Sequence, residues 1–182
     1  MKNKSGAMEM SVGTIVTIVL LMGVLVLGVF LIQNIFSSAK GAIDLTDQQL
    51  KDEINKLFSG DSRMSIYPGT KFVEIKQENT DGVGIGIRNL AVGEAGTKTF
   101  SYEVIASDVK DCGVSEGEAE SWIVTGKSES NIPIPSGEIV TDKILFRIPV
   151  GAPLCIAKFR INVDSEGEAY ATDSFNIEIK PK

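Results

Sequence analysis

Residues that most often carry catalysis are scarce in this chain. Its 182 residues include no histidine, which removes the commonest general base at neutral pH and the commonest zinc ligand. Ser37 with Lys40, and Ser107 with Lys110, have Ser-x-x-Lys spacing, but the companion motifs of such enzymes are missing. A catalytic pair formed by two carboxylates that lie far apart in the sequence stays an open alternative. With no nucleophile matched to a base, we predict that the protein is not an enzyme and has no catalytic residues.

Cys112 and Cys155 are the two cysteines, so a four-cysteine zinc site and a Cys-x-x-Cys redox motif are both excluded. They lie 43 positions apart (155 − 112), and an oxidising compartment would let them pair. A bridge over a loop of this size stabilises by about 2–4 kcal/mol. The pair is therefore the candidate disulfide, and two buried free thiols are the alternative.

Glycines at positions 82, 84 and 86 alternate along one stretch without the spacing of a dinucleotide-binding motif. Residues 126–128 resemble the end of a phosphate-binding loop, but Ser121 stands where its first glycine belongs. We therefore predict no cofactor. Alternating glycines leave one face of a strand without side chains, where a helix, a neighbouring subunit or the domain's own loops can lie close.

The chain is acidic, with a formal charge of −6. Its four charged residues before position 41 sum to +2, so residues 41–182 carry −8. This balance argues against nucleic-acid binding, which needs clustered lysine and arginine. The acidic stretches 116–120 and 164–168 do not follow the EF-hand ligand pattern, so we interpret them as solvated loops and predict no metal site.

The stretch from Val12 to Phe36 contains no charged residue over 25 positions (36 − 12 + 1). About 20 apolar residues, at a rise of 1.5 Å each, cross the hydrocarbon core of a bilayer. The pattern predicts a transmembrane helix over residues 12–36. Lys2 and Lys4 place residues 1–11 in the cytoplasm as a basic leader, and the C-terminal domain outside the cell.

The first residues also suggest a family. Basic residues, then Gly6 and Ala7, then Glu9 before an unbroken apolar helix resemble the class III signal of archaeal type IV pilin-like proteins, which include archaellins. The resemblance covers residues 1–40. It implies that a prepilin peptidase cuts after Gly6 or Ala7, and that the retained helix packs in a filament core. An uncut N-terminal anchor is the alternative.

Glu9 and three small residues are the helix-packing candidates of this segment. In a filament Glu9 would pair with a mature N-terminal amine; otherwise it is an interfacial acid. Gly13, Thr17 and Gly28 lie near one helical face, where small side chains let helices approach closely. Glycine and threonine are also simply common in membrane helices. We expect a homo-oligomer formed through this helix.

Residues 37–61 form a connector with one amphipathic helix. Thr46 and Gln49 have the spacing of a capping box, and Gly60 suits a helix stop. Apolar residues follow at helical spacing: Leu50, Ile54, Leu57 and Phe58. The pattern predicts a short helix over residues 47–58 whose apolar stripe packs on the following domain.

From residue 64 the apolar period changes to two, and turn-rich pieces separate the runs. About seven short alternating strands predict a single, mainly antiparallel β-sandwich over residues 62–182. Its late runs, residues 136–149 and 170–180, resemble strands of immunoglobulin-like domains on microbial surfaces. With the two helices, the expected fold class is α+β.

We expect a structural, non-catalytic subunit of a type IV pilus-like or archaellum-like surface filament. Its expected partners are the membrane, further copies of the chain and a prepilin peptidase. The alternative is a single-span, membrane-anchored surface protein whose sandwich binds a partner or a carbohydrate without polymerising. The two differ at Gly6 and Ala7, because a mature protein that still begins at Met1 would remove the main support for the filament subunit.

Overall fold

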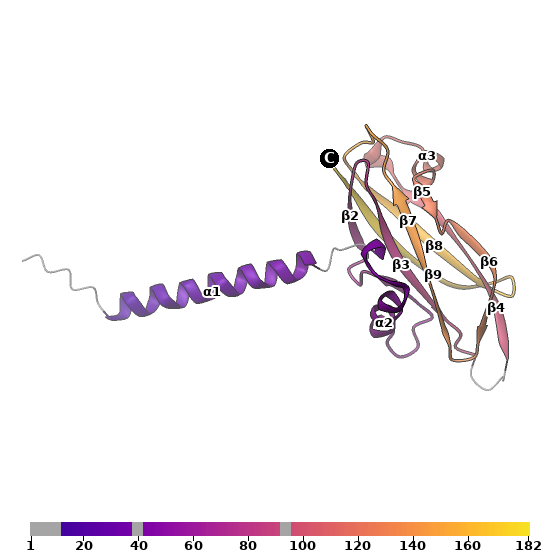
Figure 1. Ribbon diagram of the computed structural model, residues 1–182, viewed down its shortest axis with the longest axis horizontal. Helices are drawn as coiled ribbons and strands as arrows, with labels where there is room; N and C mark the ends of the chain where they lie inside the picture. Colours follow the sequence, from indigo (N-terminus) through magenta and orange to yellow (C-terminus); the bar gives the residue numbers. More distant parts are fainter. Residues whose placement is uncertain (1–11, 38–41, 92–95) are drawn as a thin grey trace, which may run out of the picture. The chain divides into compact units, whose positions relative to one another are not determined.

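The computed structural model describes residues 12–37, 42–91 and 96–182, and the chain divides into two compact units, residues 1–37 and 38–182 (Figure 1). The first unit holds helix α1 (Val12–Ser37). The second, the β unit, carries all nine strands found in the described residues. The chain is therefore mainly β, and the predicted α+β class is wrong. The sequence pattern gave the helices too much weight, because beyond α1 only short helical segments accompany the strands.

Among the helices that the structure describes, none has both the length and the apolar character needed to cross a membrane. The prediction of a transmembrane helix over residues 12–36 is therefore wrong. The classification as a pilin-like membrane protein loses its support together with the span.

The β unit consists of a four-stranded and a five-stranded sheet. The first sheet has the order β1 (Met64–Tyr67), β3 (Thr80–Arg88), β7 (Ile139–Arg147), β5 (Ile123–Thr125), and its pairs are antiparallel. The second has the order β2 (Phe72–Lys76), β9 (Glu168–Lys180), β8 (Ile156–Ser165), β4 (Thr97–Asp108), β6 (Ser128–Pro135). Its one parallel pair within the described chain joins β2 to β9. Consecutive strands β1 and β2 thus belong to different sheets.

Inward-facing side chains of the two sheets form one core. The two-residue period is clearest in β8, whose buried and exposed positions alternate from Ile156 to Val163. Phe146 of the first sheet packs edge-on against Phe159 and Phe175 of the second, with ring centroids 4.7 and 5.9 Å apart. These contacts join the sheets by burying apolar surface, which is the main stabilising term in folding.

Helix α2 (Asp47–Leu57) begins at the predicted capping box and ends one residue before the predicted end. The amide of Gln49 donates to Thr46 Oγ1 at 3.3 Å, and the amide of Thr46 donates to Gln49 Oε1 at 3.0 Å. Two of the N-terminal amides are thereby satisfied. The 3₁₀ turn η1 (Ala42–Asp44) precedes the helix. Leu50 and Ile54 of α2 are buried, as its apolar stripe predicted.

The alternating glycines of β3 make room for α2. A Cβ on Gly84 would overlap the side chain of Leu50, and a Cβ on Gly86 would lie 2.9 Å from the Phe58 ring. The bare strand face predicted from the sequence is therefore covered by a helix of the same chain. Because α2 fills this face, it is not available to a neighbouring subunit.

Between β4 and β5 the chain forms two short helical segments at the end of the β unit that also carries the C-terminus (Figure 1). These are the 3₁₀ turn η2 (Lys110–Cys112) and helix α3 (Glu116–Glu120). Ser115 caps α3 by accepting a hydrogen bond from the amide of Glu118 at 3.2 Å. The acidic stretch interpreted as a loop is thus one helical turn with its carboxylates largely exposed.

Candidate functional site

Three predicted site residues lie outside the described part of the chain. These are the cleavage candidates Gly6 and Ala7 and the helix-packing candidate Glu9. Their roles stay predictions.

The other helix-packing candidates lie in α1. Thr17 Oγ1 donates to the carbonyl of Gly13 at 2.7 Å, so the hydroxyl is satisfied inside the helix. Nothing lies within 4 Å of the position that a Cβ on Gly28 would occupy. The large apolar side chains of the described part of α1, from Ile15 to Val29, are 45–67% exposed. They occupy consecutive positions and so point to every side of the helix.

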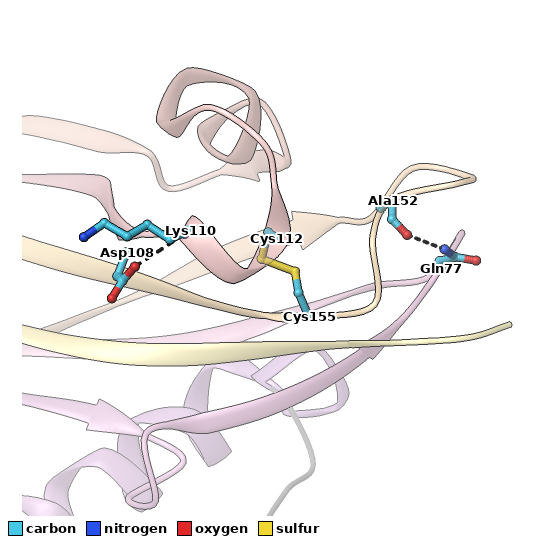
Figure 2. Close-up of a disulfide and its surroundings, with 6 residues drawn as sticks. All are labelled: Gln77, Asp108, Lys110, Cys112, Ala152 and Cys155. Atoms are coloured by element: carbon cyan, nitrogen blue, oxygen red, sulfur yellow. Dashed lines mark hydrogen bonds between the residues drawn. A yellow bond between two sulfur atoms is a disulfide. The ribbon is translucent and has the colours of Figure 1, made fainter.

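The two cysteines meet in the β unit. A disulfide joins Cys112, at the end of η2, to Cys155, just before β8, with 5.1 Å between their Cα atoms (Figure 2). Cys112 is buried and Cys155 is partly buried. The bridge ties the β4–β5 connection to the β7–β8 connection at one end of the β unit. The structure therefore brings together two segments 43 residues apart.

The β7–β8 connection, residues 149–155, is an exposed apolar loop that is fastened on both sides. The disulfide holds its end, and Gln77 Nε2 donates to the carbonyl of Ala152 at 2.6 Å (Figure 2). Within the loop Ala152 is buried, whereas Val150 is 74% exposed and Leu154 is 60% exposed. We call this segment the apolar loop. Its fixed backbone presents two large apolar side chains to solvent.

Acidic residues are frequent in the β4–β5 connection, which the disulfide joins to the apolar loop. Residues 108–120 contain five acidic residues and one lysine. Asp111 adjoins Cys112, and Glu116 and Glu118 are exposed on α3. Asp108 accepts a hydrogen bond from the amide of Lys110 at 3.4 Å (Figure 2). This end of the β unit is therefore an apolar projection with an acidic flank.

A cleft of about 470 Å³ lies near the start of β1 and the β8–β9 turn. Leu90, Ala169 and Tyr170 line it, and its charged residues are Arg63, Lys98, Glu166 and Glu168. Tyr170 is fixed in place, because its hydroxyl donates to the carbonyl of Arg88 at 2.7 Å and accepts from the amide of Leu90 at 3.1 Å. We call this site the Arg63 cleft.

Arg63 and Lys98 supply the positive charge of the cleft. The Arg63 guanidinium lies 5.0 Å from the centre of the Tyr170 ring and donates to the Tyr170 carbonyl at 3.0 Å. Lys98 pairs with Glu166 at 3.6 Å. Within the described residues Arg63 forms no ion pair with a carboxylate, so its charge is the less compensated of the two.

A cluster of three acidic groups joins the two sheets. The hydroxyl of Tyr102, on β4, donates to Asp142 Oδ2, on β7, at 2.5 Å. Burial raises the pKa of Tyr102, and the hydrogen bond to Asp142 raises it further. Burial and then a hydrogen bond to Asp142 also raise the pKa of Glu129, on β6. Sequence analysis missed this cluster, because no local pattern links residues 40 positions apart on different sheets.

The described residues show no arrangement with an evident reaction. Ser107 of the second Ser-x-x-Lys pair donates to the carbonyl of Lys158 at 3.2 Å instead of meeting Lys110. In residues 12–37, 42–91 and 96–182, no group of three potential metal ligands is found. Asp142, which accepts the hydrogen bond of the Tyr102 hydroxyl, also lines a second cleft of about 380 Å³ with Thr125, Thr141 and Lys143. The absence of catalysis stays a prediction.

Comparisons with known proteins do not assign the chain to a family. No protein-family model matches it, and no match was found among curated proteins. Similar solved structures include a family 123 glycoside hydrolase from Clostridium perfringens that acts on glycolipid glycans, with a TM-score of 0.41 and 10% identity. That match covers 64% of this chain and 26% of the hydrolase.

A second solved structure is the alkylpurine DNA glycosylase AlkC of Pseudomonas fluorescens bound to DNA with an abasic site analogue, with a TM-score of 0.32 and 8% identity. The match covers 71% of this chain and 34% of the glycosylase. The chain thus spans about a quarter to a third of the length of these enzymes. At these TM-scores and identities neither similarity indicates a function for this chain.

Proposed function

We propose that this chain is a non-catalytic structural subunit that assembles through α1 into a surface filament, with the β unit on the outside. The observation that carries the proposal is the exposure of apolar side chains on every side of α1. A helix that is apolar all round is stable in water only when other groups cover it. Further copies of α1 can cover all sides of the helix at once, whereas the surface of a single partner covers only one side.

The energetics favour a core of packed helices. Burying one valine, leucine or isoleucine side chain stabilises by about 1.5–3 kcal/mol, and α1 offers many of them without a charged residue. The hydroxyl of Thr17 costs little in such a core, because Gly13 already accepts its hydrogen bond. Gly28 adds no side chain that would hold a neighbouring helix away.

In this proposal the β unit is a rigid exterior body to which the connecting segment is firmly attached. Lys143 Nζ, on β7, donates to the carbonyl of Leu45 at 2.8 Å and pairs with Asp47 at 3.0 Å. Arg88, on β3, lies 4.4 Å from the centre of the Phe58 ring. Both ends of α2 are thus held on the first sheet. Helix α2 is therefore a fixed part of the β unit.

The test compares matched lysine substitutions in the full chain. Val24 is an exposed apolar residue of α1 and Val124 an exposed apolar residue of β5. Val24→Lys should abolish assembly measured by sedimentation and electron microscopy, because a charge cannot be buried cheaply among apolar helices. Val124→Lys should leave assembly unchanged. A wild-type chain that stays monomeric at all concentrations would refute the proposal.

The Arg63 cleft supports a second candidate, a binding module that does not polymerise. Its volume of about 470 Å³ falls within the range of small-molecule sites. A monomeric full chain that binds a saccharide or peptide, with Arg63→Gln and Tyr170→Phe both weakening binding, would favour this candidate. Assembly that depends on Val24 would favour the first.

A further inference from the structure

The β unit carries a projection at one end and a hollow at the other. Strand β8 begins beside the apolar loop, at Ile156, and ends at Ser165 in the lining of the Arg63 cleft. Its ten residues span about 33 Å at the rise of an extended strand. Figure 1 shows the same arrangement, with the β7–β8 connection near the C-terminus and the β8–β9 turn at the opposite end.

The apolar loop is suited to insertion into another surface. Val150 and Leu154 are exposed, although residues of this kind are usually buried. The disulfide and the hydrogen bond from Gln77 to Ala152 hold the backbone beneath them. Little conformational entropy is therefore lost when these side chains bind, and this favours association.

Charge decides which surface of a second copy the loop meets. Contact between two apolar loops would bring two acidic flanks together, each with Asp111, Glu116 and Glu118. Contact with the Arg63 cleft instead places that flank against a lining in which the charges of Arg63 and Lys98 balance those of Glu166 and Glu168, so two acidic surfaces do not meet. The lining of the cleft by Leu90, Ala169 and Tyr170 also offers apolar surface to Val150 and Leu154.

We infer that the apolar loop of one copy docks into the Arg63 cleft of the next, so that β units associate head to tail. Such a contact uses two different surfaces of the chain and leaves one of each free, so it repeats along a filament rather than closing as a dimer does. The inference rests on the proposed function for its setting, because it describes how the β units of an assembly built on α1 contact one another.

The test places a photo-crosslinking amino acid at Leu154 in the full chain and maps the products by mass spectrometry. The expected product joins position 154 to residues 88–91 or 165–170 of a second copy. Arg63→Gln should reduce its yield by about tenfold, the loss that follows from 1.4 kcal/mol of contact energy. The matched control Lys51→Gln removes one exposed charge from α2, outside both the cleft lining and the apolar loop, and should leave the yield unchanged.

Two outcomes would overturn the inference. One is a product that joins position 154 to the same loop of a second copy, and the other is the absence of an intermolecular product in assembled protein. Melting curves of the Arg63→Gln chain separate a lost contact from a lost fold. Leu154→Asp provides a second variant, which changes an exposed side chain and should weaken association without lowering stability.

The result can be separated from that for the proposed function. If Val24→Lys abolishes assembly but position 154 crosslinks elsewhere, the filament proposal stands and the head-to-tail contact is wrong. If the wild-type chain does not assemble, crosslinking in concentrated solution still tests the contact, because the loop and the cleft both belong to the β unit. A mapped 154-to-cleft product would then support the contact without the filament.

Discussion

Leu50 of α2 occupies the space that a side chain on Gly84 of β3 would need. The Cγ and Cδ2 atoms of Leu50 lie 3.1 Å from the position of a Cβ on Gly84, closer than ordinary van der Waals contact. Large side chains on α2 therefore fit where β3 has none. This match attaches the connecting segment to the β unit.

Gly84→Ala should destabilise the β unit by about 1–3 kcal/mol, because overpacking forces the helix or the strand to shift. Urea unfolding followed by tryptophan fluorescence measures the change. Gly117→Ala in α3 is the matched control, since nothing lies within 4 Å of its Cβ position. It should be neutral or slightly stabilising, because alanine favours a helix over glycine.

The same contact can be tested by coupling. Leu50→Ala alone should cost about 2–5 kcal/mol, the usual range for truncating a buried leucine. In the double variant the space vacated by Leu50 accommodates the alanine at position 84. The double variant should therefore be destabilised by less than the sum of the two single-variant effects. Strict additivity would show that Gly84 is not limited by Leu50.

Replacing Cys112 and Cys155 together by serine should lower the free energy of unfolding by about 2–4 kcal/mol, because the unfolded chain regains loop entropy. Thermal melts with and without reductant measure this effect. Reductant should shift the wild-type melt and leave that of the double serine variant unchanged. Two cysteines that alkylate without prior reduction would contradict the bridge.

Glu129 should make the stability of the β unit depend on pH. Its pKa is raised in the folded state, by burial first and then by the hydrogen bond to Asp142. A carboxyl whose folded pKa is raised contributes stability that is fully present below its unfolded pKa and is lost as pH rises through the folded pKa. Acidic solution should therefore favour the contact between β6 and β7.

The test of this prediction is urea unfolding between pH 4 and pH 7. Glu129→Gln keeps a group that can donate to Asp142 at every pH, so it should flatten the part of the profile that Glu129 causes. Glu116→Gln, on the exposed turn α3, is the control and should retain the wild-type profile. Identical profiles for wild type and Glu129→Gln would show that Glu129 holds no additional proton when folded.

Local patterns in the sequence predicted the features that depend on near neighbours. The capping box of Thr46 and Gln49 marked the start of α2, because cap and helix lie within four residues. Alternation from Ile156 to Val163 predicted a strand with one buried face. The glycines of β3 predicted a close neighbour, although three kinds of neighbour remained open. The apolar run predicted α1, but its interpretation as a membrane span was wrong.

What only the tertiary structure decided depends on strand pairing between residues far apart. Tyr102 meets Asp142, and Arg63 meets Tyr170, because strands from opposite parts of the chain lie together. A two-residue period says which face of a strand is buried but not which strand lies beside it. The amphipathic stripe of α2 likewise did not specify β3, since any flat apolar face would have fitted it. That Leu50 lies against Gly84 is decided by the tertiary placement of α2 on β3.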